Sequence, residues 1–92
     1  MKFIGFFEFD LKDFGKVIEK YNQRLAQPDK FPKIIFGPYA LNEGGKGFTG
    51  LETDDDEQLA RLMFHFVPEV EWTFLPISEA SLSIQVWKKM KG

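Results

Sequence analysis

Residues 47–60, GFTGLETDDDEQLA, join a predicted strand directly to a predicted helix. We predict the strand over Gly47–Thr53. Thr53–Glu57 then supplies a capping side chain and several carboxylates, which suit a first helical turn because its unpaired N–H groups and the helix dipole attract negative charge. Metal-binding loops space their carboxylates at alternate positions and include a turning Gly, whereas these acids are consecutive, so the run indicates a helix cap. The helix continues through apolar residues at helical spacing, Leu59, Leu62, Met63 and Phe66.

The chain on either side of this stretch alternates strands and helices. The aromatic run Phe3–Phe9 predicts a first strand, and apolar residues at helical spacing predict a helix from Phe14 to Leu25. Residues 34–36 predict an edge strand between prolines, and residues 70–77 alternate as a fourth strand does. The order β-α-β-β-α-β predicts an α+β, ferredoxin-like sandwich with a four-stranded antiparallel or mixed sheet.

The last residues form an extension. We assign residues 1–78 to a ferredoxin-like domain and residues 79–92 to a C-terminal extension of the same domain. Leu82, Val86 and Met90 recur four apart and favour a helix. Residues 82–86 also alternate strictly, which would instead give a fifth strand.

Glycines surround the start of the third strand. Asn42–Gly45 has the length and composition of a hairpin connection. Gly47 and Gly50 weaken the strand locally, and a bulge explains such glycines more often than close approach by a ligand or another backbone.

The composition restricts the classes of protein to which the chain can belong. It has 92 residues, 43% of them hydrophobic, and no Cys, which predicts one globular domain and excludes disulfides, thiolate metal sites and a catalytic cysteine. The net charge of −2 argues against nucleic acid as a partner. No stretch approaches the roughly 20 apolar residues needed to span a bilayer. We therefore expect a soluble cytoplasmic protein with no cofactor, metal site, nucleic-acid partner or membrane partner.

The predicted sheet carries apolar side chains on both faces. Two right-handed crossover helices cover only one face, yet Ile4 and Phe6 alternate with Phe3, Phe7 and Phe9. About four aromatic side chains, of ~150 Å² each, lie on the other face. Their combined area approaches one partner's share of a standard interface, about 800 Å². We expect a homodimer packed sheet to sheet, with a C-terminal tail folded across this face as the alternative.

Three segments resemble a known family. The opening MKF, the stretch GFTGLETDDDEQLA and the strand EWTFLPISE are similar to an uncharacterised bacterial and archaeal domain-of-unknown-function family in the dimeric α/β-barrel superfamily. The resemblance covers roughly Met1 to Glu79 and implies sheet-to-sheet dimers. Better-known relatives in that superfamily include cofactor-free monooxygenases, haem-degrading enzymes, lactone isomerases and amino-acid-sensing modules, so the fold alone assigns no function.

Five residues are candidates for a functional site. With the first and third strands taken as adjacent and parallel, Glu8 and Glu52 could lie together, and a carboxylate pair in a semi-apolar site suits general acid or base catalysis. Tyr39 and Trp72 each combine an apolar ring with a polar tip, as ligand pockets do, although core packing explains such residues equally well. His65, the one histidine, lies off the apolar stripe of its helix. We include it as a third candidate ligand-binding residue, with exposure near a helix end as the alternative.

These observations support three hypotheses about function. The first is a homodimer that binds a small organic ligand in a pocket between sheet and helices. The second is a cofactor-independent monooxygenase-like or isomerase-like enzyme acting on an aromatic or polyketide-like molecule, with Glu8 or Glu52 as base and Tyr39 orienting the substrate. The third is a protein–protein interaction module that binds by strand addition along residues 34–36.

Overall fold

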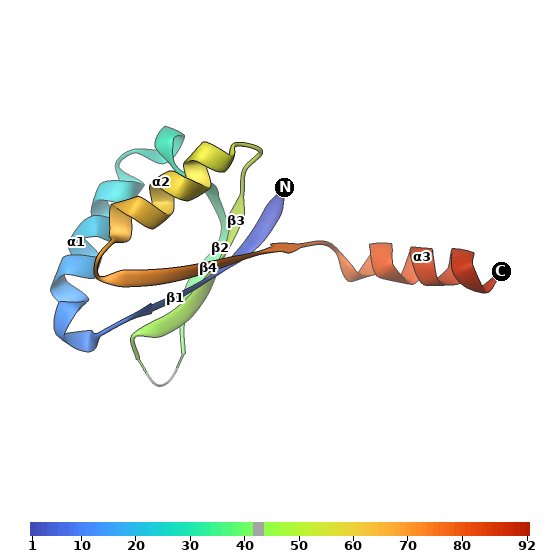
Figure 1. Cartoon of the computed structure of the whole chain (residues 1–92), viewed down its shortest axis with the longest axis horizontal. Coiled ribbons are helices and arrows are strands. Elements are labelled where there is room, and N and C mark those ends of the chain that lie inside the picture. Colours follow the sequence, from blue (N-terminus) through green and yellow to red (C-terminus); the bar gives the residue numbers. More distant parts are fainter. Residues whose placement is uncertain (42–43) are drawn as a thin grey trace.

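The chain folds into a four-stranded antiparallel sheet with two helices on one face and a third helix extending away from it (Figure 1). A computed structural model describes residues 1–41 and 44–92. Asn42 and Glu43 of the predicted hairpin connection lie outside the described residues.

The order of elements confirms the α+β class and is compatible with a ferredoxin-like fold. The elements are β1 (Lys2–Phe9), α1 (Phe14–Leu25), β2 (Lys33–Ala40), β3 (Lys46–Glu52), α2 (Asp56–Phe66), β4 (Val70–Ile77) and α3 (Ala80–Lys91). The last element is a helix, so the alternative of a fifth strand was wrong. None of the helices formed by the described residues is long and apolar enough to cross a membrane.

The strands lie in the order β2-β3-β1-β4, and every neighbouring pair is antiparallel. The expectation that the first and third strands run parallel was therefore wrong. The reason is topological: α1 returns the chain so that β2 runs parallel to β1 with one strand between them. That strand, β3, follows β2 through a short connection that reverses the chain, so it runs antiparallel to both neighbours.

The core lies between α2 and the central strands. Leu62 of α2 and Leu51 of β3 are fully buried, and the core is completed by Phe31, Phe66 and Val70. α2 begins as the acidic run predicts: the Glu57 N–H donates to Asp55 Oδ1 at 2.9 Å, and the Asp55 N–H donates to Thr53 Oγ1 at 3.0 Å. These two hydrogen bonds confirm that this part of the run caps α2.

The glycines of β3 allow close approach and do not form a bulge in that strand. β3 pairs with β1 without any register shift, and the irregularities of its pairing with β2 occur at Ile34/Phe36 and Phe36/Tyr39. A Cβ on Gly47 would collide with the Tyr39 carbonyl oxygen, and one on Gly50 would collide with the Phe36 ring. The bulge that we expected in β3 is thus on its partner strand, and the glycines make room for it.

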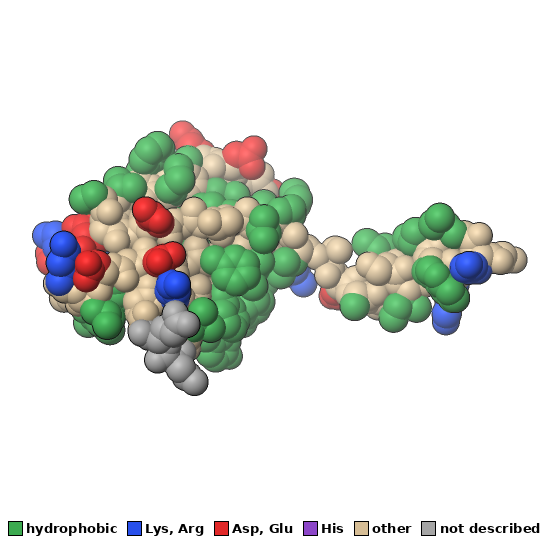
Figure 2. All heavy atoms as spheres, turned by 60° about the horizontal axis from the view of Figure 1, so that its bottom comes forward, with side chains coloured by type: hydrophobic (Ala, Val, Ile, Leu, Met, Phe, Trp, Pro, Cys, Tyr) green, Lys and Arg blue, Asp and Glu red, His purple; other side chains and the backbone are tan. Residues whose placement is uncertain are grey.

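The face of the sheet opposite the helices is open and apolar. Cross-strand register groups these side chains on it: Ile4, Phe6, Phe36, Tyr39, Phe48, Leu75 and Ile77. Phe6 is 41% exposed and Leu75 is 49% exposed. Figure 2 shows hydrophobic side chains gathered on the part of the body nearest the linker to α3, with charged side chains toward the opposite end.

α3 leaves the end of β4 and points away from the sheet, which gives the molecule extents of 55 × 31 × 18 Å (Figure 1). No residue of α3 is buried, and its apolar side chains are exposed: Leu82, Ile84, Val86, Trp87 and Met90. The tail does not fold across the open face, so that alternative to a homodimer was wrong.

We expect two glycine substitutions to change stability in opposite directions. Gly47→Ala should lower the free energy of unfolding by ~1–3 kcal/mol, because the new methyl group meets the Tyr39 carbonyl and the Phe7 ring. Gly15→Ala should raise it by ~0.5–1 kcal/mol, because Gly15 lies in α1 with open space around it and alanine restricts the unfolded chain. Urea denaturation measures both. Equal effects of the two substitutions would contradict the close approach at Gly47.

Candidate functional site

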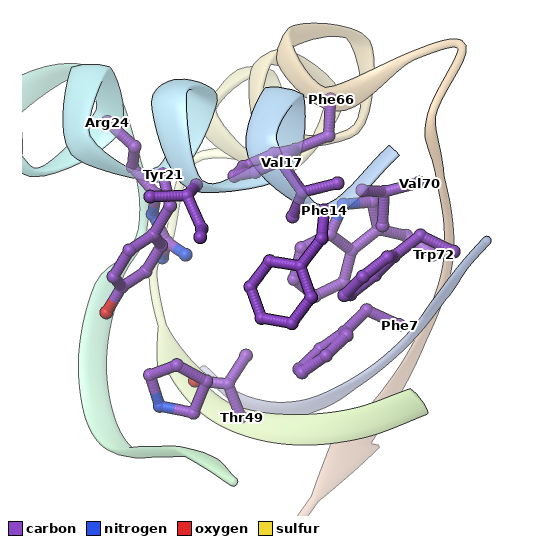
Figure 3. Close-up of a pocket in the computed structure, with 12 residues that line it drawn as sticks. Phe7, Phe14, Val17, Tyr21, Arg24, Thr49, Phe66, Val70 and Trp72 are labelled. Atoms are coloured by element: carbon purple, nitrogen blue, oxygen red, sulfur yellow. The ribbon is translucent and has the colours of Figure 1, made fainter. Parts of the chain in front are cut away.

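α1 stands off the sheet and leaves a partly open cavity of about 170 Å³ beneath it. Figure 3 shows Phe14, Val17 and Tyr21 entering the cavity from α1, and Phe7, Thr49 and Trp72 entering it from the sheet. The apolar face of α1 is incompletely packed, because Phe14 and Ile18 are each 47% exposed although both line the cavity. The lining is almost wholly apolar, which is typical of a site for a small organic molecule.

Trp72 lies in this cavity. Its ring stacks on Phe74 with centroids 5.4 Å apart and meets the edges of Phe7 at 5.6 Å and Phe66 at 5.8 Å. The indole Nε1–H is buried and has no hydrogen-bond partner among the described residues. A buried donor without an acceptor costs about 1–3 kcal/mol, so such groups in native structures call for a specific reason.

Arg24 also lines the cavity, which we did not predict from the sequence. The residue is only 4% exposed, and Nη2–H donates to the Pro32 carbonyl oxygen at 3.3 Å. Burial lowers the pKa of Arg24 to about 10, with a smaller opposing effect from Tyr21. One signal could have revealed it: Arg24 follows Val17 by seven residues, two helical turns, and therefore lies on the apolar stripe of α1.

Lys20 joins α1 to the connection between α2 and β4. Its Nζ donates to Glu69 Oε2 at 2.6 Å and to the Val67 carbonyl oxygen at 2.7 Å, where α2 gives way to β4. The two side chains of the Lys20–Glu69 pair are 15% and 12% exposed. The hydrogen bond from Lys20 is the main cause that lowers the pKa of Glu69.

His65 of α2 also contacts Lys20 of α1, and it does not line the cavity. Its Nε2–H donates to the Lys20 carbonyl oxygen at 2.7 Å. The ring packs against Phe31 and Phe66, with centroids 5.2 and 5.1 Å away. The structure therefore gives His65 a structural role, joining α2 to α1.

The other three candidates lie on the open face. Tyr39 packs on Phe48 with ring centroids 5.5 Å apart and is 55% exposed. Glu8 is opposite Lys46, whose Nζ lies 3.9 Å from Glu8 Oε1, whereas Glu52 is opposite Lys2 at the other end of β1. The antiparallel register thus separates Glu8 and Glu52, and they do not form the pair that we expected. Within the described residues, no group of three or more His, Asp or Glu side chains could hold a metal ion.

Comparison with protein-family models, with curated proteins and with solved structures found no match to this chain. The resemblance to a dimeric α/β-barrel family stays a prediction.

We expect the Lys20–Glu69 pair to make stability depend on pH. Because the pKa of Glu69 is lowered in the folded protein, the stabilisation is complete above the ordinary glutamate value of about 4.3 and is lost as pH falls through the lowered value. Glu69→Gln should reduce stability at neutral pH and flatten its dependence on pH in the acid range. Urea denaturation at a series of pH values tests this.

Glu19→Gln, which breaks an exposed pair with Lys16, is the control and should change stability little. An unchanged pH dependence in Glu69→Gln would contradict the role of the pair.

Proposed function

We propose that this protein is a homodimer that binds a small organic ligand in the cavity between α1 and the sheet. The observation that carries the ligand proposal is an apolar cavity of about 170 Å³ that is lined by aromatic side chains, Trp72 among them, and by the buried cation of Arg24. An engineered apolar cavity of about 150 Å³ accommodates benzene, so a single ring or a short aliphatic chain fits this space.

Ligand binding has more support than catalysis. None of the described residues that line the cavity is Asp, Glu or His, the side chains that most often transfer protons. Glu8 and Tyr39, which the enzymatic hypothesis needs, lie on the opposite face of the sheet.

Trp72 provides a direct test of binding. The chain has two tryptophans, so Trp87→Phe leaves Trp72 as the only indole, inside the cavity. We expect toluene, phenol or hexanol to change its fluorescence saturably. Val17→Phe, which fills the cavity from α1, should weaken this binding at least tenfold.

Val86→Phe is the matched control, because Val86 lies on α3, is 47% exposed and does not line the cavity. It should bind as the Trp87→Phe parent does. No saturable change with any of the three compounds, or equal binding by Val17→Phe and its parent, would overturn the assignment of the ligand site.

The open face supports the homodimer. Seven apolar side chains share it, and neither α1 nor α2 nor the tail covers it. Monomers seldom expose a contiguous apolar surface above a few hundred Å², and an isologous two-fold contact buries the same surface on both copies. Strand addition at the β2 edge has less support, because two register irregularities and Pro38 interrupt that edge.

Two substitutions test the homodimer, one of a phenylalanine on the open face and one of a phenylalanine on the helix side. Phe6→Glu places a charge on the open face and should convert a dimer into a monomer, as measured by light scattering after size exclusion. Phe64→Glu, at a 65% exposed position on α2, makes the same chemical change on the helix side and should leave the dimer intact. A monomeric parent protein at high micromolar concentration would refute the dimer.

A further inference from the structure

Arg24 is a buried cation for which the described part of the chain provides no anionic partner. None of the ion pairs formed within the described part of the chain includes Arg24. The one hydrogen bond of its guanidinium there goes to the Pro32 carbonyl oxygen. The residue is 4% exposed and lines the cavity, so its charge is kept from bulk water beside an otherwise apolar space.

Such an arrangement is costly unless a negative charge completes it. A guanidinium has five N–H donors in a planar fork, and its best-matched partner is a carboxylate that accepts two of them. Desolvating a cation without a counter-ion costs several kcal/mol, and the lowered pKa of Arg24 has the same cause. A ligand carboxylate would remove this penalty and form a charge-assisted pair in a site of low polarity.

The other polar groups near the cavity do not compete for this role. The Trp72 indole N–H is itself buried and does not open into the cavity, and the hydroxyl of Thr49 already donates to the Phe36 carbonyl at 3.0 Å. Arg24 is therefore the one charged group among the described residues that line the cavity, and the complementary ligand carries an anionic acceptor. The remaining wall, with Phe7, Phe14 and Val17, suits an apolar body.

We propose that the ligand of this cavity is a small monocarboxylate with a single aromatic ring or a short aliphatic chain, its carboxylate paired with Arg24. This inference rests on the ligand site proposed above. Figure 3 shows the arrangement: Arg24 and Tyr21 lie toward one end of the cavity, and Phe7, Phe14 and Trp72 lie toward the other. The carboxylate occupies the arginine end, and the apolar body lies among the aromatic rings.

Three probes of similar size test the charge preference through the fluorescence of Trp72 in the Trp87→Phe protein. Benzoate carries the carboxylate, benzamide replaces it with a neutral group of the same shape, and toluene has no polar group. Benzoate should bind at least tenfold more tightly than benzamide. Arg24→Met should reduce this preference to less than twofold, and the folded variant should still bind toluene.

Arg61→Met is the matched control, because Arg61 is exposed and its guanidinium donates to the Lys30 carbonyl at 2.8 Å. It should keep the full preference for benzoate. If circular dichroism shows Arg24→Met to be unfolded, Arg24→Lys keeps the cation without the fork and should bind benzoate several-fold more weakly than the parent does.

The outcomes separate this inference from the proposed site. Toluene binding together with equal affinities for benzoate and benzamide would overturn the carboxylate and leave the cavity as a site for neutral molecules. Failure of all three probes to bind would overturn both. Retention of the benzoate preference in folded Arg24→Met would refute the role of Arg24.

Discussion

The attachment of α1 through Lys20 is the constraint on which the site depends. Its ammonium group and its carbonyl oxygen both bind the region where α2 ends and β4 begins, through Glu69, Val67 and His65. These polar contacts hold α1 beside α2 while part of its apolar face remains unpacked over the sheet. The space that results is the cavity, with Arg24 buried toward one end and Trp72 toward the other.

Most of the fold follows from local sequence patterns, whereas the relative direction of the central strands does not. Alternation and helical spacing, with the acidic cap before α2, locate the strands and helices. The pattern of β1 or β3 alone says nothing about which way each runs in the sheet. That direction follows from the insertion of β3 between β1 and β2, and for this reason Glu8 and Glu52 lie far apart.

The candidate site was only partly predictable. Trp72 could be chosen because a ring with a polar tip suits a pocket, and the structure places it there. Arg24 was missed because charged side chains on helices usually face water, and only its position on the apolar stripe of α1 indicates otherwise. The contact of His65 with Lys20 joins residues 45 apart in sequence, which no local pattern encodes.

The buried core and the lining of the cavity share several side chains. Among the described residues, Phe66 and Val70 belong to the core and also border the cavity, and Val17 and Trp72 line the cavity while packing against the core. Phe14 and Ile18 line the cavity but are each 47% exposed, so they lie outside that core. Mutations at these two positions can therefore alter the shape of the cavity at little cost to the core. Related chains can therefore differ in the shape of this cavity while keeping the same scaffold.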